Sequence, residues 1–340
     1  MAPAKKTSAR KAKPDHQQFD ILSLPDVVLP SSTRVKSTPI HLVESAQFSK
    51  WIASQPKPTA NQLAAQNFTA KAGSVALTYG DDGKLTAVIV GYAKTIGLYT
   101  ICPALDKIGT GDTAGKFHVE SVTLNKDECT NVVTGWILAC YRFTAFKVAP
   151  TDYPQLIQPK GTDALRAESL ARAIYMVRNL VNLPPNALGP QALAEAVVMV
   201  ADMFKAKSRV IVDTDLITEN FPLIYGVGDG SERRPRLVDF TWGNAKHPKV
   251  TLVGKGVCFD TGGYDLKPSS AMLLMKKDMG GAAMALGVAY MVMALNLPVR
   301  LRVIIPAVEN SVSGHAYRPS DILHSRKGLT VEINNTDAEG

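Results

Sequence analysis

Apolar residues follow two different periods in the second half of the chain. Leu170, Ile174, Val177 and Val181 recur at helical spacing until Pro184, which predicts a long helix that ends there. Further helices are predicted over 191–205, opened by Pro190, and over 280–295. Short apolar runs predict strands over 208–213, 235–242, 249–254, 299–305 and 330–333. Strands that alternate with helices favour an α/β domain with a mainly parallel central sheet.

The first half of the chain predicts a smaller α/β domain. Residues 75–79 and 85–90 flank a Gly-Asp-Asp-Gly turn, which predicts a β-hairpin, and residues 130–146 carry apolar side chains along one helical face. Residues 19–60 are rich in Pro and Ser and predict an irregular lead-in with one short helix near 45–54. We therefore expect a tail and lead-in over 1–39, a small N-terminal domain over 40–150 and a catalytic domain over 151–340.

Most of the net positive charge comes from a short N-terminal tail. The formal net charge of the 340 residues is +8, and five of the basic residues precede the first acid at Asp15, which leaves +3 for the rest. These residues are Lys5, Lys6, Arg10, Lys11 and Lys13. We expect residues 1–18 to be a disordered, solvated arm, and a nucleic-acid-binding arm is the less favoured alternative.

The spacing of the cysteines and the length of the apolar stretches indicate where in the cell the protein is located. Cys102, Cys129, Cys140 and Cys258 show no CxxC spacing, which is typical of free thiols in a reducing compartment. No apolar stretch reaches the ~20 residues that a membrane span requires. The N-terminal tail lacks the apolar core of a secretory signal, although its basic and Ser-rich composition leaves a transit peptide open. These features predict a cytoplasmic protein with no membrane partner.

A glycine-rich loop is predicted after the strand at 249–254, and it contains a lysine and a carboxylate, Lys255 and Asp260. Open α/β sheets bind ligands at the carboxyl ends of their strands. A phosphate-binding loop is the first alternative, but the segment lacks both the GxxxxGK[ST] spacing and the third glycine of GxGxxG. We therefore reject a nucleotide site here.

More charged residues follow around the apolar helix predicted at 280–295. Asp265, Lys267 and Asp278 precede it, and Asp337 and Glu339 end the chain. On an extended segment Asp337 and Glu339 would point the same way. Each residue alone is ordinarily a solvated charge, and Asp278 could simply favour a helix N-terminus. Together they predict an oxygen-rich site for paired divalent ions, with zinc or manganese as the candidates.

Five motifs in this order resemble those of the leucyl (cytosol) aminopeptidases, peptidase family M17. They are Val-Gly-Lys-Gly at 253–256, Phe-Asp-Thr-Gly-Gly at 259–263, Leu-Lys-Pro at 266–268, Lys-Asp-Met-Gly-Gly-Ala-Ala at 277–283 and Asn-Thr-Asp-Ala-Glu-Gly at 335–340. The resemblance is strong over 160–340 and weak over 40–150. It implies a two-metal aminopeptidase that releases N-terminal, leucine-like residues from peptide substrates.

The resemblance also implies roles for individual residues. One ion would be held by Lys255, Asp260, Asp278 and Glu339, and the second by Asp260, Asp337 and Glu339. Lys255 would then be a neutral amine, which requires a pKa far below ~10.4. Lys267 would stay charged and hydrogen-bond the carbonyl oxygen as it becomes an oxyanion, and Met275 would line the pocket for the N-terminal side chain.

The family's last motif continues with an arginine that holds a bicarbonate ion, and the family's catalytic domain runs on beyond it. We therefore expect a C-terminally truncated fragment with weak metal binding and little or no peptidase activity. The resemblance implies a homohexamer for the intact protein. A nucleic-acid-binding or a non-catalytic structural member of the same family remains the alternative.

Overall fold

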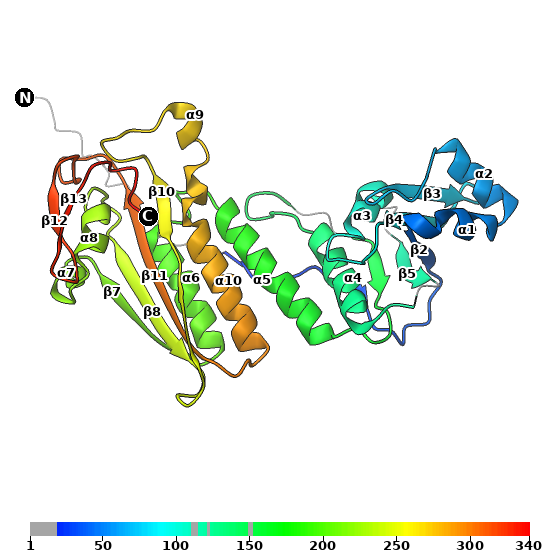
Figure 1. Cartoon of the computed structure of the whole chain (residues 1–340), viewed down its shortest axis with the longest axis horizontal. Helices are drawn as coiled ribbons and strands as arrows, with labels where there is room; N and C mark the ends of the chain where they lie inside the picture. The colour runs from blue at the N-terminus through cyan, green and yellow to red at the C-terminus, as the bar shows by residue number, and fades with distance from the viewer. Residues whose placement is uncertain (1–18, 110–114, 121–122, 149–151) are drawn as a thin grey trace, which may run out of the picture.

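The computed structural model describes residues 19–109, 115–120, 123–148 and 152–340. Figure 1 shows an elongated molecule with an α/β lobe at each end and the long helix α5 (Ala164–Asn182) between them. The predicted tail at 1–18 lies outside the described residues. Among the described helices, none is both long and apolar enough to cross a membrane.

The N-terminal lobe is built on a six-stranded sheet of order β1-β6-β5-β2-β4-β3. Its strands are β1 (Val28–Leu29), β2 (Thr38–Glu44), β3 (Val75–Tyr79), β4 (Leu85–Tyr92), β5 (Lys116–Glu120) and β6 (Gln155–Ile157). Its helices are α1 (Phe48–Ala53), α2 (Lys57–Ala65), α3 (Cys102–Ile108) and α4 (Lys126–Ala139), with the 3-10 turn η1 (Ser45–Gln47). β3 and β4 form the predicted antiparallel hairpin.

Two local predictions in this lobe were wrong. The segment predicted as an irregular lead-in contains β2, which pairs with both β4 and β5. Pro39 and the flanking serines concealed this strand, although Ile40 and Leu42 are buried in the core. The helix predicted over 130–146 runs earlier, because Asn125 and Glu128 form a capping box at its start.

β1 and β6 belong to the N-terminal sheet and lie outside 40–150. β6 pairs in parallel with both β5 and β1, which leaves β1 at the edge of the sheet. The division of the chain at 39 and 150 stays a prediction.

The C-terminal lobe contains a five-stranded sheet in which β11 pairs with three strands. The strands are β7 (Lys207–Val212), β8 (Arg236–Trp242), β9 (Lys249–Val253), β10 (Gly256–Asp260) and β11 (Arg300–Asn310). β9 and β10 lie parallel to β11, whereas β8 is antiparallel to both β11 and β7. Four of these five strands therefore run in one direction, and the predicted mainly parallel α/β fold is confirmed.

Helices α6 (Pro190–Met203) and α10 (Gly280–Ala294) pack against this sheet, and α5 packs on α10, so that all three share one apolar core (Figure 1). Val238 and Phe240 of β8 and Leu301 and Val303 of β11 form the sheet side of the core. The shorter helices are α7 (Asp215–Thr218), α8 (Pro222–Gly228), α9 (Ser269–Met272) and the 3-10 turn η2 (Met275–Met279). The core fixes the strand ends that carry the site.

Two predictions in this lobe need correction. The glycine-rich segment predicted as a loop is partly strand β10, because Gly256 allows close approach to Pro306 of β11. The predicted strand at 330–333 is β13 (Thr330–Glu332), which among the described strands pairs with β12 (Ile322–His324) alone, in a separate antiparallel ribbon. It therefore does not extend the central sheet.

Candidate metal centre

The site is built at the carboxyl ends of two parallel strands. Asp260 ends β10 and Asn310 ends β11, and the two residues are partners in the strand register. Asp260 Oδ1 accepts hydrogen bonds from Gly262 N at 2.8 Å and from Asn310 Nδ2 at 2.9 Å. Because these bonds fix one carboxylate oxygen, the other oxygen is directed toward Lys267.

Three carboxylates meet at this edge of the sheet. Asp260, Asp337 and Glu339 each offer an oxygen, and these oxygens all lie within 4.8 Å of one another. Asp337 and Glu339 lie on the irregular segment after β13, and Asp337 lies in a turn, so the segment is not the extended one considered from the sequence. Figure 1 shows the chain end beside β10 and β11. The turn, rather than an extended strand, places the two acidic residues next to Asp260.

Two lysines lie against these carboxylates. Lys255, between β9 and β10, places Nζ 2.6 Å from Glu339 Oε1 and 2.9 Å from Asp278 Oδ2. Lys267, in the loop after β10, places Nζ 3.0 Å from Asp260 Oδ2 and pairs with Asp337. Each lysine thus joins a carboxylate from β10 or η2 to one from the terminal segment.

Close backbone packing positions Lys255. Its carbonyl oxygen accepts a hydrogen bond from Ala282 N, at 2.8 Å, in the first turn of α10. A Cβ at Gly254 would lie 2.6 Å from Ala282 Cα, so glycine is required where the helix meets the strand. The Gly-Lys-Gly spacing therefore reflects helix–strand packing as well as chemistry.

Several buried oxygens of the cluster have no hydrogen-bond partner among the described residues. They are Asp278 Oδ2 and both carboxylate oxygens of Glu339, whose side chain is 1% exposed. Lys255 lies within ion-pair distance of two of these atoms, but hydrogen-bond geometry is not met. Buried charged oxygens without hydrogen bonds are costly unless a cation compensates them. The donor set of carboxylates and amines therefore fits divalent ions.

The charges shift the pKa values of the cluster. Burial alone would lower the pKa of Lys255, but its contacts with Glu339 and Asp278 outweigh burial and raise it. Likewise, the pKa of Lys267 is raised, because Asp337 and Asp260 outweigh the effect of burial. Burial raises the pKa of Glu339. The neutral Lys255 amine implied by the resemblance would require an adjacent cation, since the carboxylates alone favour the ammonium form.

The structure brings together six residues named from the sequence: Lys255, Asp260, Lys267, Asp278, Asp337 and Glu339. Met275 is half-buried and opens η2, the short turn that carries Asp278. The metal-binding, catalytic and substrate-binding roles of these residues stay predictions.

Three supporting residues were not predicted from the sequence. Asn310 and Tyr317 donate hydrogen bonds to the carbonyl oxygen of Thr336, at 2.9 and 2.8 Å. Asn310 could have been found as a polar residue at the end of a strand next to Asp260. No local pattern marks Tyr317 or Thr336 as neighbours, because 19 residues separate them.

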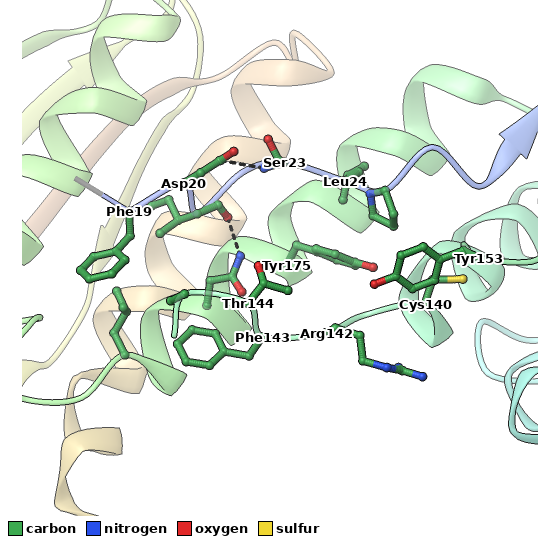
Figure 2. Close-up of a pocket in the computed structure, with 15 residues that line it drawn as sticks. Phe19, Asp20, Ser23, Leu24, Cys140, Arg142, Phe143, Thr144, Tyr153 and Tyr175 are labelled. Carbon is green, nitrogen blue, oxygen red and sulfur yellow. Dashed lines mark hydrogen bonds between the residues drawn. The ribbon is translucent and has the colours of Figure 1, made fainter. Parts of the chain in front are cut away.

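A cavity of about 430 Å³ lies away from this cluster. Figure 2 shows it between the lead-in at 19–25, the loop after α4 and helix α5, with Tyr153 and Tyr175 on its wall. None of the six clustered residues lines it. We assign the candidate site to the carboxylate cluster, because cavity size alone carries no chemistry.

Known proteins match both lobes. The family model described as "M17 aminopeptidase, N-terminal domain" matches residues 38–159, and "Cytosol aminopeptidase family, catalytic domain" matches residues 175–340. A probable cytosol aminopeptidase of Corynebacterium efficiens is 37% identical over 235 residues, which are 66% of this chain and 47% of the relative. The chain spans about half the length of the curated relatives it matches.

Solved structures show the same fold. The cytosol aminopeptidase of Coxiella burnetii has a TM-score of 0.81 and 38% identity, covering 92% of this chain and 67% of that one. The bottromycin maturation enzyme BotP, in complex with Mn, has a TM-score of 0.76 and 26% identity, covering 89% and 66%. The resemblance in the sequence motifs is confirmed. The chain therefore belongs to the cytosol aminopeptidase family.

Proposed function

We propose that this chain carries the two-metal centre of an aminopeptidase that releases N-terminal residues from peptides. The observation that carries the proposal is the cluster of three carboxylates within 4.8 Å, which includes the buried Glu339. Both oxygens of Glu339 lack a hydrogen-bond partner among the described residues. Family membership supports the reaction class, and the Mn complex of BotP supports divalent ions.

Five residues would hold the ions. The family resemblance implies that the two ions would share Asp260 and Glu339, and both residues lie in the carboxylate cluster with Asp337. Lys255 and Asp278 would complete one site, and Asp337 would complete the other. Bound there, the ions would supply Lewis-acid polarisation of the scissile carbonyl and a nucleophile at neutral pH.

Lys267 would act directly on the substrate. Its ammonium group lies between Asp260 and Asp337, and both carboxylates favour the charged form. A charged donor already positioned in a partly dry site stabilises an oxyanion that develops on the scissile carbonyl. Lys267 thus serves as the electrostatic catalyst of peptide cleavage.

Met275 would contact the substrate's N-terminal side chain. It lies three residues before Asp278 on η2, so the same short turn would hold a metal ligand and the specificity pocket. An unbranched, polarisable side chain adapts to aliphatic surfaces, which suits a leucine-like residue. The proposed substrates are therefore peptides with a leucine-like N-terminal residue.

Several finer predictions accompany this proposal. Mn²⁺ or Zn²⁺ are the proposed ions. By resemblance to the family, the intact site would also bind bicarbonate, and the intact protein would assemble as a homohexamer. Relatives named cytosol aminopeptidases support a cytoplasmic location. The low turnover expected of the 340-residue chain also stays a prediction.

The alternatives rest on other features. The basic arm proposed for nucleic acid lies in residues 1–18, outside the described part of the chain. A non-catalytic structural role has no need of buried carboxylate oxygens that make no hydrogen bond among the described residues, and such oxygens are costly to keep. The aminopeptidase proposal accounts for them.

Hydrolysis of a leucyl amide tests the proposal. We would compare the 340-residue chain with a version extended past Gly340 at the gene level, each with added Mn²⁺ or Zn²⁺. Activity in the extended form alone supports both the site and the low turnover of the shorter chain. Activity in both forms overturns the low-turnover prediction, and activity in neither contradicts the aminopeptidase function.

A further inference from the structure

The terminal segment that carries Asp337 and Glu339 has few backbone anchors. Ile333 exchanges backbone hydrogen bonds with Ser320 and Asp321, at 2.7 and 2.9 Å. Beyond it, the backbone of 334–340 forms no backbone–backbone hydrogen bond with another segment of the described chain. Something else must hold two carboxylates at a site that tolerates little displacement.

Thr336 supplies the missing anchor. Its backbone N–H donates to Asp265 Oδ2 at 2.7 Å, and its carbonyl oxygen accepts from Asn310 Nδ2 and the Tyr317 hydroxyl. Its own hydroxyl accepts from Asp265 N at 2.9 Å and donates to Gly262 O at 2.6 Å. Thr336 is fully buried, so these bonds are shielded from water.

The bonds of Thr336 end on the loop that carries the other half of the site. Gly262 and Asp265 lie between Asp260 and Lys267, so Thr336 ties that loop to the segment with Asp337 and Glu339. Asp265 bonds both backbone and side chain of Thr336, as a reciprocal pair. The two halves of the cluster therefore share one joint.

Asn310 makes the joint more direct. Its single Nδ2 atom donates to Asp260 Oδ1 and to Thr336 O, each at 2.9 Å. One amide group thus sets the position of a cluster carboxylate relative to the terminal segment. Gly263 allows this approach, because a Cβ there would lie 2.8 Å from Thr336 Oγ1.

We propose that Thr336, Asp265 and Asn310 are positioning residues that set the metal affinity of the centre by joining its two halves. The inference rests on the proposed two-metal site. None of the three needs to touch an ion: they fix where Asp260, Asp337 and Glu339 point. Loss of partners outside the ligand set lowers metal affinity by roughly 10–100-fold in known metal sites.

Calorimetric titration of the full 340-residue chain with Mn²⁺ tests the inference. Thr336→Val removes the hydroxyl at constant shape, Thr336→Ser restores it, and Asp265→Ala removes the reciprocal acceptor. Thr134→Val is the matched control, since Thr134 is also fully buried and its hydroxyl donates to Thr130 O at 2.8 Å in α4. Far-UV circular dichroism reports whether each variant folds.

We expect Thr336→Val and Asp265→Ala to raise the Mn²⁺ Kd by at least about tenfold. Thr336→Ser and Thr134→Val should retain the wild-type Kd. The visible spectrum of bound Co²⁺, which reports ligand geometry, should change in Thr336→Val and not in Thr134→Val.

A wild-type Mn²⁺ Kd in both Thr336→Val and Asp265→Ala would overturn the proposal that these residues set the metal affinity. An equal loss in Thr134→Val would overturn it too, because the effect would then be general destabilisation. If Thr336→Val does not fold, the comparison of Asp265→Ala with Thr134→Val decides in the same way. Absence of Mn²⁺ binding by the wild-type chain would instead contradict the proposed metal centre, which separates the two failures.

Discussion

The two lobes bury polar groups in different ways. The buried polar residues of the described N-terminal lobe are the threonines Thr78, Thr130 and Thr134, and each hydroxyl hydrogen-bonds a backbone carbonyl. The C-terminal lobe buries charged and amide groups instead, among them Asp260, Glu309 and Asn310. In one lobe polar atoms complete the fold, whereas the other also gathers carboxylates and lysines at one edge of its sheet.

His41 is the exception in the N-terminal lobe, since its Nδ1 is buried without a hydrogen-bond partner among the described residues. Burial lowers the pKa of His41, which favours the neutral ring, and the ring lies 5.6 Å from that of Trp51. A neutral imidazole costs far less to bury than an ionised carboxylate. The comparison between the lobes therefore rests on charge, and unpaired atoms alone do not mark a site.

The largest expected effect breaks the N-terminal lobe and leaves the site intact. Trp136 is fully buried against Phe117, and its Nε1 donates to Pro154 O at 3.0 Å. Trp136→Ala should cost about 3–5 kcal/mol in the free energy of unfolding, measured by urea denaturation. The folded fraction should bind Mn²⁺ as the wild type does. Weaker Mn²⁺ binding by the folded protein would show that the lobes are not independent.

The next effect breaks the site and leaves the fold. Asp260→Asn removes the charge of the carboxylate that contacts both Asn310 and Lys267. Because Asp260 is a proposed shared ligand, Mn²⁺ affinity should fall by more than the roughly 10–100-fold typical of outer residues. Asp239→Asn is the control, as another buried aspartate of the same lobe that pairs with Arg302. Equal affinities in the two variants, measured by calorimetry, would refute the assignment.

Alanine substitution of two glycines distinguishes the effect of backbone strain from the effect of contacts with Thr336. Gly263 and Gly83 have φ values of +63° and +73°, so alanine at either should cost about 1–2 kcal/mol of stability. A Cβ at Gly263 would press on Thr336, whereas a Cβ at Gly83 would meet no atom within 4 Å. Gly263→Ala should therefore weaken Mn²⁺ binding, and Gly83→Ala should only lower the thermal midpoint. Parallel losses of affinity would remove Thr336 from the account.

The smallest effect concerns pH and a paired carboxylate outside the site. The hydrogen bonds from Arg302 lower the pKa of Asp239, so this pair stabilises the fold above the unfolded value of ~3.9. Its contribution disappears as the pH falls through the lower folded pKa. Arg302→Gln should cost about 0.5–1 kcal/mol at neutral pH, because the arginine is half-exposed and screened.

The cost of Arg302→Gln should shrink below about pH 4, where Asp239 is protonated in the unfolded chain. Urea denaturation at several pH values measures it. A cost that stays constant down to pH 2 would mean that the Arg302 contacts stabilise by packing rather than by charge.

Local pattern predicted the fold class and most elements of the C-terminal lobe. The helix that ends before Pro184 and the helix opened by Pro190 occur as α5 and α6, because periodicity and proline act within a few residues. β10 was missed because its glycines resemble a loop, although they allow close packing on β11. Whether a glycine-rich stretch is strand or loop depends on the partner strand.

The same limit applies to the site. Motif resemblance named the six charged residues that the structure brings together. An extended segment was considered for Asp337 and Glu339, but the structure has a turn at Asp337, and side-chain bonds to Thr336 rather than sheet pairing hold that segment. Contacts across 71 residues, such as Asp265 with Thr336, leave no local pattern to read.

The count of Mn²⁺ ions bound per chain tests the central claim most directly. Equilibrium dialysis of the 340-residue chain at neutral pH should give two Mn²⁺ per chain once Mn²⁺ is raised to saturation, which the expected weak binding requires. Glu339→Gln should reduce that number because Glu339 is the proposed ligand of both ions. Zn²⁺ should compete for the same sites. A chain that binds no Mn²⁺ or Zn²⁺, or one whose binding is unchanged by Glu339→Gln, would contradict the two-metal centre.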